Sequence, residues 1–121
     1  MELKNTLFAL SNILDAAEAQ SGLSALDQES KAILKFVGAN TRNGQEICVK
    51  DITQNSALPG SPVTQMKRIQ RLCQDGWLLQ GSSELHHRRI TLSLSPRATR
   101  ELNAVSQQLE KQLHRQLISK P

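Results

Sequence analysis

Apolar residues recur every three or four positions along most of this 121-residue chain, which is the spacing of one buried face of a helix. The pattern predicts an opening helix that stops near residue 21 and a second helix that begins at Asp27 as its N-cap. A short helix is expected over residues 50–56, a better-defined one over residues 61–76 and a long one after residue 95. The chain is therefore expected to be mainly α.

Strand signals lie between these helices. Residues 46–49 are a short strand candidate, and residues 77–80 and 89–94 form a predicted hairpin with a polar, basic tip. The apolar residues expected on the buried face of its second strand are Ile90, Leu92 and Leu94. The order helix, helix, strand, helix, helix, strand, strand, helix is that of a winged helix-turn-helix with a small antiparallel β-sheet.

The helix over residues 61–76 carries recognisable signals at both ends. Ser61 is a favourable N-cap, Pro62 suits the first helical position, and Gly76 can adopt the left-handed conformation that ends a helix. The residues expected on its inward side are Val63, Met66, Ile69, Leu72 and Cys73. The residues expected on the opposite side are Thr64, Lys67, Arg68 and Arg71, which give the basic, hydroxyl-bearing face of a recognition helix.

Positive charge is concentrated around this helix. The chain has 15 Lys and Arg against 11 Asp and Glu, and residues 60–100 alone hold seven basic residues against two acidic ones, a local net charge of +5. Such a concentration is what binding to phosphates through counterion release requires. A solvated basic surface without a partner is the alternative interpretation.

Three runs carry a resemblance to a known family. They are Ser61-Pro62-x-Thr64, the segment Lys67-Arg68-Ile69-x-x-Leu72 that leads to Gly76-Trp77-Leu78, and His86-His87-Arg88 followed by Leu92-Ser93-Leu94-Ser95. With these runs the chain resembles the MarR-type transcriptional regulators over roughly residues 26–109. Two positions depart from the family pattern. His86 stands where the wing usually carries an Asp, and Gln65 stands where related motifs often have an apolar residue, which leaves the helix register open by about one position.

The resemblance implies a sequence-specific DNA-binding transcriptional regulator, a repressor that binds double-stranded DNA as a dimer on a pseudo-palindromic operator. It also implies a small-molecule effector, whose identity the residues do not give. Repression and activation both remain open. Two alternatives use the same fold: a winged-helix protein-interaction module, and a plasmid or phage replication or partition factor.

The DNA contacts are expected on the recognition helix and the wing. We expect Ser61, Thr64, Gln65 and Arg68 to face base edges, with Arg68 bonding a guanine and Gln65 an adenine. Lys67 and Arg71 are expected to contact phosphates. The full set predicted for the recognition helix is Ser61, Pro62, Thr64, Gln65, Lys67, Arg68 and Arg71. The set predicted for the wing is His86, His87, Arg88 and Arg89, which would reach the minor groove or its phosphates.

Length and periodicity predict one winged-helix domain over residues 1–121, with a DNA-binding lobe at 26–95 and its wing at 81–89. The terminal helices, 1–21 and 96–118, carry longer apolar stripes than the lobe can cover, which predicts a homodimer. The dimerisation residues expected are Leu3, Leu7, Leu10 and Leu14 in the first helix, and Leu102, Val105, Leu109, Leu113 and Leu117 in the last. The alternative is that both helices fold back on their own domain.

Other function classes find little support in the sequence. It has no phosphate-binding loop, nucleophile elbow or metal-ligand spacing, so we expect no enzyme activity, metal or cofactor. Cys48 and Cys73 are expected to be small core side chains. No stretch is long and apolar enough to span a membrane, and the N-terminus lacks the apolar core of a signal peptide, so a cytoplasmic protein is expected.

Overall fold

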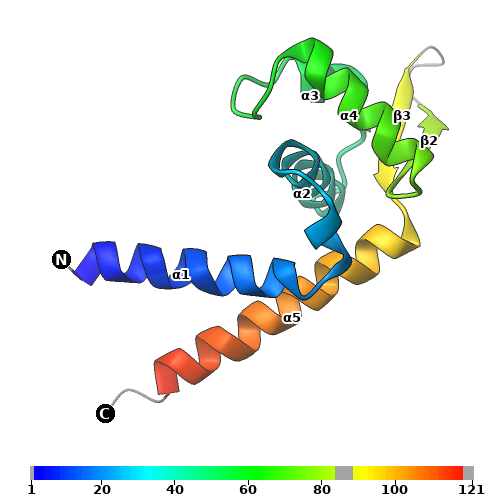
Figure 1. The fold of residues 1–121 in the computed structure, drawn as a ribbon. Coiled ribbons are helices and arrows are strands. Elements are labelled where there is room, and N and C mark those ends of the chain that lie inside the picture. The colour runs from blue at the N-terminus through cyan, green and yellow to red at the C-terminus, as the bar shows by residue number, and fades with distance from the viewer. Residues whose placement is uncertain (1, 84–88, 119–121) are drawn as a thin grey trace. The chain divides into compact units, whose positions relative to one another are not determined.

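The computed structural model describes residues 2–83 and 89–118, with side chains for residues 6–83 and 89–115. The elements are α1 (Glu2–Ala19), the 3-10 turn η1 (Gly22–Ala25), α2 (Gln28–Arg42), β1 (Ile47–Cys48), α3 (Val49–Thr53), α4 (Pro62–Gln74), β2 (Leu78–Ser82), β3 (Ile90–Leu94) and α5 (Pro96–Ile118) (Figure 1). This order confirms the predicted fold class, a mainly α winged helix-turn-helix with a small antiparallel sheet.

The chain forms two compact units. One contains Leu26–Thr99, and the other contains α1, η1 and the part of α5 that begins at Arg100. Helix α5 thus starts in the first of these units and continues into the second. No helix among the described residues combines the length and apolar character needed to cross a membrane.

The core of the Leu26–Thr99 unit lies where α2, α3 and α4 meet the sheet. Within the described residues the strands are arranged β1-β3-β2, all antiparallel. Helix α4 packs against α2, α3 and β2 (Figure 1). The buried apolar side chains of this core are Ile33, Leu34, Val37, Ile47, Cys48, Ile52, Ile69, Leu72, Trp77, Leu78, Leu92 and Ala98.

Strand β3 differs in one respect from the sequence prediction. Leu92 is buried and Leu94 is half-buried, as expected, but Ile90 is 52% exposed. The short β1 pairs only with Leu92 and Thr91, whereas Ile90 lies opposite Ser82 at the far end of the hairpin. The hydrophobic core ends before Ile90. The alternation of apolar and polar residues continues to Ile90, but no described core side chains are there to cover it.

Helix α4 has the two ends that its sequence predicts. At the start, the Ser61 hydroxyl accepts a hydrogen bond from the Thr64 N–H at 3.2 Å, and Pro62 occupies the first turn. At the end, Gly76 has φ 80°, and the Trp77 N–H donates to the Leu72 carbonyl at 2.8 Å. This pairing across a left-handed glycine is a Schellman motif, which satisfies carbonyls that the last helical turn leaves unpaired.

The segment that follows α1 is joined to α5 by polar contacts within their unit. The Gln108 side chain donates to the Gln20 side chain at 3.3 Å, and the Gly22 N–H donates to the Glu101 carboxylate. On α1, Ala17 is buried, but Leu7, Phe8 and Leu10 are exposed. A row of exposed apolar residues therefore runs along the N-terminal half of α1.

Replacing Gly76 with alanine should destabilise the protein by about 1–2 kcal/mol, because an L-residue is strained in the left-handed region. A Cβ at this position would meet no atom within 4 Å. The loss of stability would therefore come from backbone conformation alone. The free energy of unfolding in urea measures it. Gln74→Ala, an exposed change on the same helix, should stay within about 0.5 kcal/mol of the parent; equal stability of the two variants would contradict the left-handed cap.

Candidate nucleic-acid interface

Helix α4 presents a continuous face to solvent. Val63 is 66% exposed and Met66 is 38% exposed. Together with four exposed polar residues at helical spacing they form what we call the outer face of α4: Val63, Met66, Lys67, Gln70, Arg71 and Gln74. The prediction that Val63 and Met66 point inward is wrong. The buried row is Gln65, Ile69 and Leu72, which is rotated by about one residue from the row that apolarity alone selects.

Gln65 sets this rotation. Its side chain is 2% exposed, and its amide nitrogen is 3.2 Å from the Pro59 carbonyl oxygen and 3.5 Å from that of Leu58. Both carbonyls belong to the turn between α3 and α4, so this amide supplies a donor that the turn needs. The prediction that Gln65 reads an adenine is therefore wrong, because the side chain lies in the core.

Arg68 also has its partners within the protein. Its Nε lies 2.7 Å from Asp27 Oδ2 and 3.4 Å from Glu29 Oε2, and the side chain is 36% exposed. Both carboxylates are at the start of α2, so the ion pairs connect α4 to that helix. The predicted guanine contact of Arg68 is not supported by this geometry, since its guanidinium faces α2.

Asp27 has a second role as the N-cap of α2. Its Oδ1 accepts a hydrogen bond from the Ser30 N–H at 2.8 Å. This backbone hydrogen bond is the main cause that lowers the pKa of Asp27 below its ordinary value, and the positive charge of Arg68 lowers it further. One carboxylate thus stabilises the start of α2 and holds the side of α4.

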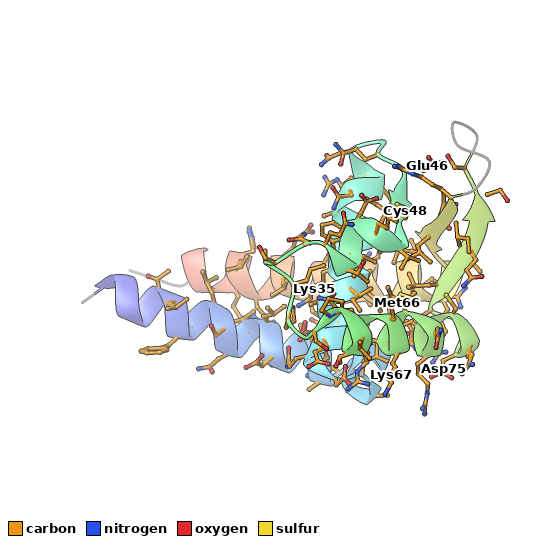
Figure 2. The ribbon with its side chains drawn as sticks, turned by 90° about the horizontal axis from the view of Figure 1, so that it is seen from above. Lys35, Glu46, Cys48, Met66, Lys67 and Asp75 are labelled. Carbon is orange, nitrogen blue, oxygen red and sulfur yellow. The ribbon has the colours of Figure 1, made fainter. Side chains whose placement is uncertain are left out.

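The remaining predicted residues of the helix lie at or near its surface. The Ser61 hydroxyl donates to Thr64 Oγ1 at 3.0 Å, so the two hydroxyl groups partly satisfy each other, and Pro62 is exposed. Lys67 is exposed on α4 (Figure 2). Arg71 pairs with Asp75 at 3.3 Å on the surface. These residues stay candidates for DNA contact.

The wing is described only at its base. His86, His87 and Arg88 lie outside the described residues, and Arg89 is exposed just before β3. The Ser83 N–H donates to the Arg89 carbonyl at 3.1 Å, and the Ser83 hydroxyl bonds the Glu46 carboxylate at 2.7 Å, beside the hairpin in Figure 2. Ser83 is buried. Its contact with Glu46 fixes the hairpin base to the segment before β1.

Sequence reasoning missed several of these positioning residues. Arg97 stacks over Trp77, with its guanidinium carbon 4.2 Å from the ring centroid, and donates to the Asp75 carbonyl at 2.9 Å. Asp27 is predicted only as the N-cap of α2, and its ion pair with Arg68, like that of Glu29, depends on how α2 packs against α4. The one sequence signal for the inner face of α4 was Gln65, which stands at a position where related motifs place an apolar residue.

Metal-ligating groups and cysteines can be located among the described residues. No group of three His, Cys, Asp or Glu side chains in the described ranges could hold a metal ion. Cys48 is buried and Cys73 half-buried, in keeping with their predicted packing roles, and burial raises the pKa of the Cys73 thiol. A thiol with a raised pKa is a weak nucleophile near neutral pH.

Solved structures share this arrangement over nearly the whole chain. The structure of RV1404 from Mycobacterium tuberculosis has a TM-score of 0.82 at 13% identity, covering 99% of this chain and 77% of the other. A protein described as a MarR-like transcription regulator from Bacillus cereus has a TM-score of 0.59 at 14% identity, covering 99% and 80%. The fold is that of the MarR-type regulators.

Another of these solved structures contains nucleic acid. A point mutant of Staphylococcus aureus MepR, bound to an oligodeoxyribonucleotide, has a TM-score of 0.74 at 15% identity, covering 98% of this chain and 80% of the other. No family model matches the sequence, and a search of curated proteins finds no match either. The likeness therefore rests on the fold, not on sequence identity.

The charge on Asp27 should make stability depend on pH in a defined direction. Its pKa is lowered in the folded protein, so its contribution is present above the unfolded value of 3.8 and is lost as pH falls below that value. Asp27→Asn keeps an N-cap side chain but removes the charge. At pH 7 it should lower the free energy of unfolding by at most about 1 kcal/mol, because the pair is partly exposed.

Urea denaturation of both proteins between pH 7 and pH 3 measures this difference, which should shrink as pH falls below 3.8 toward the lowered pKa of the folded protein. The same substitution in an Arg68→Gln background should have a smaller effect at pH 7, because the cation has gone. A difference that is independent of pH would contradict the proposed role of the Asp27 charge.

Proposed function

We propose that this chain is a sequence-specific DNA-binding transcriptional regulator, acting as a dimeric repressor on a pseudo-palindromic operator. The observation that carries the proposal is the outer face of α4, a solvent-facing stripe with two cations on a capped helix in a winged-helix fold. A MarR-type neighbour with the same fold is bound to an oligodeoxyribonucleotide. In helix-turn-helix proteins the equivalent helix enters the major groove.

The contacts divide between positioning and reading. Lys67 and Arg71 reach outward on long flexible side chains, and we assign them to phosphates, which set position but not sequence. Ser61, Pro62 and Thr64 lie at the N-terminal end of α4, the end that faces base edges in helix-turn-helix complexes. In the wing, we assign Arg89 and its neighbours His86, His87 and Arg88 to the minor groove or its phosphates.

The terminal helices support a homodimer. Leu7 and Phe8 are each 61% exposed, and Leu10 is also exposed. Exposed apolar side chains in a row mark a surface that another protein covers. On α5, Leu102, Leu109 and Leu113 are half-buried and stay candidates for the interface, whereas Val105 is buried within the protomer, so its predicted dimerisation contact is not supported. A twofold dimer would present two copies of α4 to half-sites about one helical turn apart.

A salt series on DNA binding tests the phosphate assignment. An operator is first selected from random double-stranded DNA, and its affinity is then measured against salt concentration. Lys67→Ala and Arg71→Ala should each reduce the slope of log affinity against log salt by about 0.9, the value for one lost phosphate contact. Each should weaken all sequences about equally.

Arg42→Ala is the matched control, an exposed arginine at the end of α2. Its slope should equal that of the parent. If neither α4 variant changes the slope, the outer face is not the DNA surface. If the parent selects no sequence at all, the proposed function itself is wrong.

Sedimentation at micromolar concentration tests the dimer. The parent should sediment as a dimer, and the double variant Leu7→Ser, Phe8→Ser should shift to the monomer, because both side chains would leave the interface without disturbing the protomer core. Leu79→Ser removes an exposed apolar side chain from β2 instead and should stay dimeric. A parent that is monomeric at this concentration would overturn the dimer.

A further inference from the structure

The N-terminal half of α4 has few polar groups left for reading bases. Gln65 is buried against the turn, and Arg68 is paired with Asp27 and Glu29. The hydroxyl groups of Ser61 and Thr64 bond each other, and Ser61 also caps the helix. The sequence predicted that this half of the helix reads bases by hydrogen bonds. Most of the side chains that would do so are already bonded within the protein.

Apolar side chains occupy the exposed positions instead. Among the described residues of the first two turns, the exposed ones are Pro62, Val63, Met66 and Lys67. Val63 and Met66 are three residues apart, which places them on one side of the helix, roughly 4.5 Å apart along its axis. That spacing is close to one base step of about 3.4 Å, so the two side chains can reach the same or neighbouring base pairs.

The major groove offers one apolar group for such side chains to contact. Guanine, cytosine and adenine present hydrogen-bonding groups there, whereas thymine adds its C5-methyl group. An apolar contact with that methyl removes both surfaces from water without leaving a polar group unpaired. A paired apolar surface on the leading turns of a groove-binding helix therefore favours thymine.

We propose that Val63 and Met66 determine sequence specificity by contacting thymine methyl groups in the operator half-site. This proposal rests on the proposed DNA-binding function. It adds that the first turns of α4 select thymine. Gln70, one turn further along the outer face, is exposed and has the side chain that pairs with adenine. It offers a polar control on the same face.

Replacing single thymines in the selected operator with deoxyuridine tests the proposal, because this change removes the methyl group and leaves the base pair intact. The parent should lose about fourfold in affinity at each contacted position, the equivalent of one buried methyl-sized group. The double variant Val63→Ala, Met66→Ala should bind thymine and uracil equally at those positions. Gln70→Ala should keep the preference for thymine.

Both replaced side chains are exposed, so the double variant should fold, and its thermal melting checks this. Selective binding of the parent with no position sensitive to uracil would overturn the thymine contact and leave the proposed function standing. A uracil effect that persists unchanged in the double variant would assign the methyl contact to other residues. Absence of any selective, salt-dependent DNA binding by the parent would overturn both proposals.

Discussion

The orientation of α4 depends on polar contacts along its inner side. Successive residues of a helix are about 100° apart around its axis. If the buried row shifted by one position, the outer face would therefore rotate by about 100° and different residues would be exposed on it. Gln65 anchors the first turns to the carbonyls of Leu58 and Pro59, and Arg68 anchors the next turn to Asp27 and Glu29. Because a buried amide without a hydrogen-bond partner is unfavourable, the contacts of Gln65 favour one rotation of the helix, and the ion pairs of the half-buried Arg68 favour the same rotation.

The other end of α4 is fixed by a different set of contacts. Gly76 allows the chain to reverse, Trp77 enters the core, and Arg97 covers the Trp77 ring while bonding the Asp75 carbonyl. The base of the hairpin is held to the segment before β1 through Ser83 and Glu46. Helix α4 and the start of the wing are thus supported by the same small sheet. This common support keeps their relative positions fixed, as binding to a rigid DNA duplex requires.

Local signals made most of the fold predictable. Ser61, Pro62 and Gly76 mark the ends of α4 through backbone geometry, and alternation in residues 89–94 marks a strand; neither depends on distant partners. The face of α4 could not be predicted in this way. Gln65 and Arg68 have the side chains of base-reading residues, and only the positions of the α3–α4 turn and of Asp27 show that Gln65 is buried and that Arg68 is paired with α2. Val63 and Met66 were assigned to the core because apolarity alone does not show where the core ends.

In the proposed complex the outer face of α4, beginning at Val63, lies against DNA. The most direct measurement is the alkylation rate of a thiol placed there by Val63→Cys, with and without saturating operator, resolved by mass spectrometry from Cys48 and Cys73. We expect strong protection by DNA at position 63 and none for Ala39→Cys, an exposed position on α2. Equal alkylation at position 63 with and without bound operator would contradict the proposed complex.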